Sequence, residues 1–241
     1  MAEVFPPAGQ SKRFAFTLAE VLITLGIIGV VAALTMPTLI QNYKKHEVET
    51  KLAKFYSVMN QAVRLAEVEY GNKMYWDTFE IKYGVDDEGN IDKTKIIPNF
   101  EYFNKYFAPY LKTTKITSSG TESDSIVLVY FADGSAATFD ARAIHYYIKA
   151  KDLNLDGNIR HKLKGKRLFT FYFAPTKRDI NHYNKGIEPY KDSWNGSLDS
   201  LITHPSLGCN EESFNKNEPA YCTALIQANG WKVPKNYPFK F

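Results

Sequence analysis

Glu20 is the only charged residue in an apolar segment that runs from Phe14 to Ile40. After it, Val21 to Ile40 are twenty uncharged residues in a row. Twenty residues of α-helix rise about 30 Å, enough to cross the hydrocarbon core of a bilayer. A carboxylate inside a membrane costs roughly 2.5–3.5 kcal/mol on insertion scales, so an acid in such a segment is a functional candidate. Glu20 is therefore the first candidate functional residue.

A second candidate lies in the middle of the chain, where Asp152, Asn154 and Asp156 place oxygen side chains at alternating positions before Gly157. This pattern is the first half of a calcium-binding loop. The second half is missing, because Leu163 stands where an EF-hand has its bidentate Glu. Asp, Asn and Gly are also the preferred turn residues, so a polar hairpin loop is the alternative. Calcium is thus a possible but not a required cofactor.

The two cysteines, Cys209 and Cys222, are both near the C-terminal end and enclose twelve residues. Such a pair suits one disulfide in an oxidising compartment, although two free thiols would give the same count.

No enzymatic motif accompanies these residues. The sequence has no HExxH, GxSxG or GxxxxGK[ST], and its five histidines are far apart along the chain. We therefore expect no catalytic site. A short basic run beside His161 consists of Lys162, Lys164, Lys166 and Arg167. It could contact nucleic acid, and the alternative is that these side chains are simply solvated at the approach to a strand. The net charge of +4 is modest, so nucleic acid is not the expected partner.

Three interpretations compete for the N-terminal segment. A secretory signal peptide would be cut at a small-residue site such as Val31-Ala32-Ala33, and a plain membrane anchor would not be cut. Lys12 and Arg13 would keep the N-terminus cytoplasmic and place the remainder outside. Neither interpretation accounts for Glu20.

The third interpretation rests on the residues from Phe14 to Val30, FAFTLAEVLITLGIIGV. This segment closely resembles the class III signal of type IV prepilins and type II secretion pseudopilins. The resemblance implies cleavage between Ala15 and Phe16, N-methylation of Phe16, and a role for Glu20 in filament assembly. Ala15 departs from the Gly that the family usually has before the cut. Pro37 matches a proline common in the family's first helix, where we expect a kink.

The resemblance also implies partners and a location. A prepilin peptidase would remove residues 1–15, and residues 16–40 would form a transmembrane and filament-core helix below a head of residues 41–241. The head of this single-pass inner-membrane protein would lie outside the cytoplasm, and the protein would then join a periplasmic or surface filament. The expected partners are the peptidase, other pilin or pseudopilin subunits, an inner-membrane assembly platform and the lipid bilayer.

The elements that position these residues begin with one long helix. After Ile40 an apolar stripe at spacings of three and four continues to Ala66, and Gly71-Asn72 form a C-terminal stop. The stripe consists of Val48, Leu52, Phe55, Met59, Ala62 and Ala66. We predict a helix from about Thr17 to Tyr70.

The pattern then changes to a period of two around Asp133-Gly134, a strong hairpin signal. The predicted strands cover 125–132, 135–142, 143–150 and 167–174, with a shorter one near 79–83. We also predict a helix over 101–112 capped by Asn99, and a loop-rich tail after Pro175. The fold class is therefore α+β, a long helix on an antiparallel sheet of about four strands, as in pilins.

These features favour a structural subunit of a pilus-like filament. A DNA-uptake or adhesive pilin that acts as a binding module, or a membrane-anchored periplasmic protein, are the alternatives.

Overall fold

The computed structural model describes residues 17–78, 97–120, 125–140, 142–154, 156–174, 183, 185–216 and 218–241. Its longest element is α1, Leu18–Tyr70, which is helical through Pro37. The chain divides into two compact units, one ending at Tyr43 and one running from Lys44 to Phe241. The second unit is the head, and it contains the C-terminal part of α1.

The predicted apolar stripe of α1 is confirmed. All six of its residues are buried, together with Val63. The helix ends at Tyr70, and the next residue, Gly71, has a φ of +79°, a left-handed conformation that glycine adopts without steric cost. The predicted stop is therefore also confirmed.

The head is built on one antiparallel sheet with the strand order β1-β2-β3-β4-β5-β6. The strands are β1 (Thr113–Ser119), β2 (Ile126–Phe131), β3 (Ala136–Asp140), β4 (Ala143–Tyr147), β5 (Leu168–Phe173) and β6 (Ile187–Pro189). The four predicted strands correspond to β2 through β5, with Gly134 at a φ of +76° in the β2–β3 turn. The prediction missed the two edge strands, because β1 is mostly polar and β6 has only three residues.

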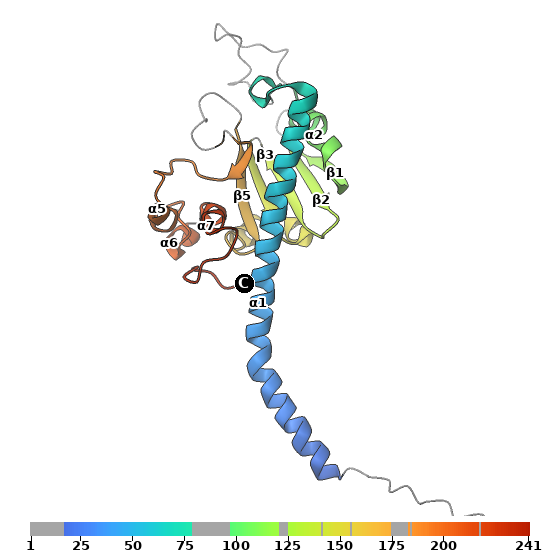
Figure 1. Ribbon diagram of the computed structural model, residues 1–241, viewed down its shortest axis with the longest axis vertical. Coiled ribbons are helices and arrows are strands. Elements are labelled where there is room, and N and C mark those ends of the chain that lie inside the picture. The colour runs from blue at the N-terminus through green and yellow to red at the C-terminus, as the bar shows by residue number, and fades with distance from the viewer. Residues whose placement is uncertain are drawn as a thin grey trace, which may run out of the picture. The chain divides into compact units, whose positions relative to one another are not determined.

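Helix α1 lies across one face of the sheet (Figure 1), and buried aromatic side chains fill the space between the two. Phe55 stacks on Tyr146 at a centroid distance of 4.2 Å and packs against Phe171 at 5.0 Å. Helix α2 (Asn99–Tyr106) adds Phe103, which packs against Phe139 at 4.6 Å. Aromatic pairs of this kind add to the free energy gained from burial alone.

The prediction for α2 was wrong in its bounds and in the role of Asn99. The helix begins at Asn99 itself, after Pro98, and ends at Tyr106 before the 3-10 turn Ala108–Tyr110. The Asn99 side chain donates instead to the carbonyls of Ser125 at 2.8 Å and Phe139 at 3.0 Å. The buried amide satisfies these two carbonyls and does not cap the helix.

The tail is more ordered than predicted. It contains α5 (Leu198–Thr203), α6 (Glu211–Asn215) and α7 (Cys222–Ala228), which lie together beside β5 in Figure 1. Ser197 and Asn210 cap α5 and α6 through their side chains. The other short elements among the described residues are Lys73–Tyr75, Ala150–Asn154 and α3 (Gly157–His161). The strand predicted near 79–83 lies outside the described residues.

Three polar side chains of α1 bond to β6 or to the end of the chain. Glu49 accepts from the Val233 N–H at 2.9 Å and from Lys232 Nζ at 3.0 Å. Burial alone would raise the pKa of Glu49, but these donors outweigh it and hold the pKa below its ordinary value. Tyr56 donates to the buried Glu188 at 2.7 Å, and Asn60 bonds to the backbone of Ile187.

Candidate functional site

The first turn of α1 contains the candidate assembly residue, Glu20. The Thr17 N–H and the Thr17 hydroxyl both donate to Glu20 Oε2, each at 2.8 Å. In return, the Glu20 N–H donates to Thr17 Oγ1 at 3.2 Å. Because α1 begins at Leu18, these residues occupy the N-cap and N3 positions and form a capping box.

This geometry fixes the position of the Glu20 carboxylate. It lies beside the positive end of the helix dipole, where a negative charge is favoured. A carboxylate offers about four acceptor positions, so the two bonds from Thr17 leave room for a further donor such as an amine. The sequence prediction missed Thr17, although the Thr-x-x-Glu spacing is the known sequence signature of such a cap.

The helix that follows Glu20 has an apolar surface. Between Leu18 and Ile40 its large side chains are exposed, among them Leu22 at 61%, Ile28 at 63% and Leu34 at 74%. By length and composition α1 could cross a membrane. Contiguous apolar surface of this extent is typical of a segment that packs in lipid or against other chains.

Both predicted processing residues, Ala15 and Phe16, lie outside the described residues, as does the leader 1–15. Pro37 lies within α1, and the kink predicted there stays a prediction.

Comparison with known families gives two matches. Residues 10–36 match the model of the prokaryotic N-terminal methylation motif. Residues 38–241, which include the whole head, match a family of unknown function, DUF6613. The chain belongs to this family. No curated protein and no solved structure matches it.

The methylation motif makes this a prepilin-type protein, as the resemblance implied, and it implies processing by a prepilin peptidase. The match spans Glu20 and the start of the apolar helix. An apolar N-terminal helix with this motif is consistent with a pilin-like protein anchored in the inner membrane.

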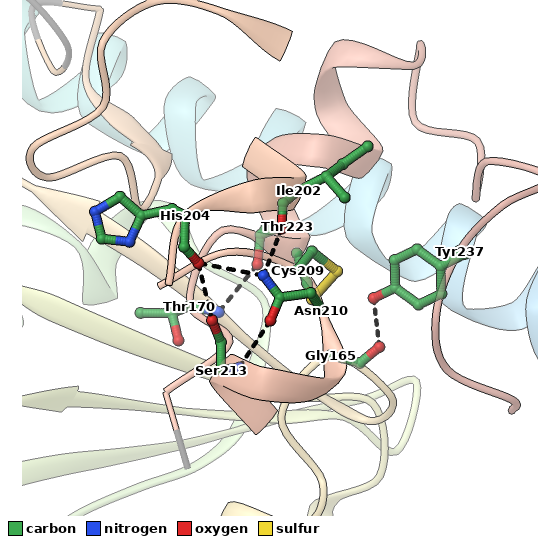
Figure 2. The surroundings of a disulfide bond; sticks show 10 residues. Gly165, Thr170, Ile202, His204, Cys209, Asn210, Ser213, Thr223 and Tyr237 are labelled. Carbon is green, nitrogen blue, oxygen red and sulfur yellow. Dashed lines mark hydrogen bonds between the residues drawn. A yellow bond between two sulfur atoms is a disulfide. The ribbon is translucent and has the colours of Figure 1, made fainter. Parts of the chain in front are cut away.

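In the head, Cys209 and Cys222 form a disulfide, which confirms the predicted pairing over two free thiols. Figure 2 shows the bond among the hydrogen bonds of α5, α6 and α7. The Asn210 amide donates to the carbonyls of Ile202 and His204, and its oxygen accepts from the Ser213 N–H at 2.7 Å. Thr223, next to Cys222, accepts from the Thr170 N–H in β5 at 3.1 Å. The disulfide therefore joins α7 to the segment before α6, and the Thr223 hydroxyl bonds α7 to the sheet.

The disulfide also packs against the loop that carries the basic run. A Cβ added to Gly165, which has a φ of +74°, would lie 2.7 Å from Phe239 and 2.9 Å from Cys222 Sγ. The Tyr237 hydroxyl donates to the Gly165 carbonyl, and Lys166 Nζ lies 4.4 Å from the centre of the Phe214 ring. The loop from Lys164 to Lys166 is thus held in a fixed conformation.

The basic run does not form one patch. Lys166 lies over Phe214, Arg167 pairs with Asp152 at 3.4 Å, and Lys162 is exposed. Lys164 instead lines a cavity on the sheet. The four charges therefore lie in four different surroundings.

The three predicted calcium ligands differ in environment. Asp152 is buried, with Oδ1 facing Arg167 and Oδ2 without a hydrogen-bond partner in the described part of the chain. Asn154 and Asp156 are exposed. Among the described residues, no group of three or more His, Cys, Asp or Glu could hold a metal ion. These side chains fit a calcium site only in part, and calcium binding stays a prediction.

Proposed function

We propose that this protein is a structural subunit of a pilus-like filament, either a type II secretion pseudopilin or a type IV pilin-like protein. The observation that carries the proposal is the position of Glu20. Its carboxylate occupies the first turn of an apolar, exposed helix, inside the segment that matches the methylation motif.

Processing would create the partner of Glu20. Hydrolysis of the Ala15–Phe16 peptide bond by a prepilin peptidase would release residues 1–15 and leave a free amine on Phe16, which is then methylated. A methylated amine keeps its positive charge. In a filament the amine of one subunit would lie against Glu20 of its neighbour, in the apolar core formed by the helices.

The pairing would set the register between subunits. Opposite charges attract more strongly in a low-dielectric core than in water. Removing one partner leaves the other buried and unpaired, at a cost of several kcal/mol. The inner-membrane assembly platform would extract each subunit from the bilayer into this environment, and the heads would cover the filament surface.

The test compares Glu20→Gln with Glu20→Ala in cells that produce the prepilin peptidase and the assembly platform. Glutamine retains an oxygen that can accept from the Thr17 N–H but has no charge, whereas alanine removes the cap as well. We expect both variants to be processed and to stay in the membrane, with at least ~10-fold less protein in the sheared filament fraction. Glu101→Gln, an exposed carboxylate of the head, is the control and should assemble normally. Normal assembly of Glu20→Gln would contradict the charge pairing.

A further inference from the structure

A cavity of about 530 Å³ lies on the face of the sheet that α1 does not cover. Its floor comes from five strands, and its wall comes from the connection between β4 and β5. The floor residues are Ser119, Ile126, Leu128, Thr138, Asp140, His145, Tyr147 and Leu168, and the wall residues are Leu153, Asn154, Arg160, His161 and Lys164.

Nitrogen side chains dominate the polar lining. Arg160 and His161 from α3, Lys164 from the following loop and His145 from β4 all face the cavity, and Asp140 of β3 is the single carboxylate among the lining residues. Glu218 from the tail acts electrostatically on Lys164 from outside the cavity. The lining thus carries an excess of positive charge.

Two of these groups have unsatisfied atoms. His145 Nδ1 and His161 Nδ1 are both buried and have no hydrogen-bond partner in the described part of the chain. A buried polar atom without a partner costs about 1–3 kcal/mol, and native proteins seldom leave one unexplained. Both atoms belong to histidines that line the cavity, so this part of the head contains polar groups that the described residues leave unsatisfied.

The electrostatics agree with this geometry. Burial lowers the pKa of His145 to about 4, and electrostatic interactions with Lys164, Arg160 and His161 lower it further. Burial also lowers the pKa of Lys164. The cluster therefore places cationic groups close together in a partly desolvated site, where a bound negative charge would offset their repulsion.

We propose that this cavity binds a small hydroxylated phosphomonoester, with the phosphate held by Arg160, His161, Lys164 and His145. An Arg guanidinium and a Lys ammonium are the side chains best suited to a doubly charged oxyanion. Asp140, Asn154, Ser119 and Thr138 provide acceptors and donors for hydroxyl groups, and the leucines provide apolar contact with a carbon skeleton. A sugar phosphate has all three features.

The loop described above supports a preformed site. Lys164 precedes Gly165, which is packed against Cys222 Sγ and Phe239, so the disulfide cluster fixes the backbone that carries the ammonium. A site whose cation is already in place loses little conformational entropy when the ligand binds.

The test is calorimetric titration of the full chain in non-ionic detergent with glucose 6-phosphate, inorganic phosphate and glucose. We expect glucose 6-phosphate to bind, phosphate to bind more weakly and glucose not to bind. Arg160→Gln should weaken binding at least ~10-fold, because it removes a charge-assisted contact. The matched control is Lys162→Gln, which removes the same charge from an exposed neighbour outside the cavity and should change affinity less than ~2-fold.

Equal weakening by both variants would mean a general electrostatic attraction and would overturn the proposal. Binding only to vesicles of phosphatidylglycerol, or only to an oligonucleotide, would overturn it as well. A second readout guards against misfolding, because the imidazole resonances of His145 in the wild-type chain should titrate at higher pH when glucose 6-phosphate is bound. An unchanged titration in the presence of saturating ligand would exclude His145 from the site.

Discussion

The side chain of Asn60 in α1 hydrogen-bonds to both backbone groups of Ile187 in the edge strand β6. Asn60 Nδ2 donates to the Ile187 carbonyl at 2.8 Å, and Asn60 Oδ1 accepts from the Ile187 N–H at 3.0 Å. The amide thus takes the place of a further strand on this edge of the sheet, where unpaired backbone groups would otherwise be left. Gly186 makes the approach possible, since a Cβ there would lie 2.4 Å from Asn60 Oδ1.

Replacing Asn60 with alanine should therefore destabilise the head. The change leaves a buried N–H and a buried carbonyl without partners, and each costs about 1–3 kcal/mol. We expect a loss of about 2–4 kcal/mol in the free energy of unfolding, measured by urea titration of the detergent-solubilised chain. The neighbouring Gln61→Ala, at an exposed position, should change it by less than about 0.5 kcal/mol. Equal effects would show that the Asn60 bonds contribute no net stability.

Gly165 and Gly134 offer a matched pair for the loop beside the disulfide. Their φ angles are +74° and +76°, but only Gly165 has neighbours that an added Cβ would meet. Gly134→Ala should cost about 1 kcal/mol from the backbone alone. Gly165→Ala should cost a further 1–3 kcal/mol or so from overpacking against Phe239 and Cys222. Similar losses in the free energy of unfolding for the two variants, measured by urea titration, would mean that the side chains around Gly165 move aside at little cost.

The disulfide between Cys209 and Cys222 closes a short loop at the end of the chain. Replacing both cysteines with alanine should lower the free energy of unfolding by about 3 kcal/mol, mainly because the unfolded chain gains freedom. A thermal melt of the wild-type chain with and without a reductant gives the same comparison without a mutation. The reductant should lower the melting temperature of the wild type and leave the double variant unchanged; a shift in the double variant would show that the reductant acts elsewhere.

His145 should make the stability of the head depend on pH. Its pKa is about 4 in the folded chain, below the ordinary histidine value of 6.5. Between these values the unfolded chain binds a proton that the folded chain does not, so stability falls as the pH is lowered from 6.5 towards 4. The slope should be about 1.4 kcal/mol per pH unit, with a total of at most about 3 kcal/mol. His145→Gln should reduce this slope, whatever the substitution does to the free energy of unfolding at pH 7. An unchanged slope would show that His145 does not cause the pH dependence.

The sequence predicted some of these features because they depend on local patterns. The methylation segment around Glu20, the stripe of α1 and the hairpin at Asp133-Gly134 each follow from residues close together in the chain. The edge strand β6 could not be predicted, because its three residues are held as a strand by β5 and by Asn60. Asn99 was misassigned for a similar reason, since its amide bonds to the carbonyls of Ser125, just before β2, and Phe139 in β3, both distant in sequence.

The candidate sites also divide into features that local sequence predicts and features that depend on residues far apart in the chain. The disulfide needed only two cysteines at one end of the chain and a compartment outside the cytoplasm. The cavity could not be predicted, because it combines residues from five strands with Arg160 and His161, and only the sheet register brings His145 opposite Thr138. The capping role of Thr17 was within reach of sequence analysis, because its spacing to Glu20 is local.

The central claim is that the chain is processed as a prepilin, and the N-terminal mass tests it most directly. The protein should be extracted from membranes of cells with and without a prepilin peptidase, and measured by intact mass and N-terminal sequencing. We predict a chain that begins at methylated Phe16 only where the peptidase is present, with Ala15→Gly cleaved at least as completely. A chain that starts at Met1 in both cells, or a cut near Ala33, would contradict the account.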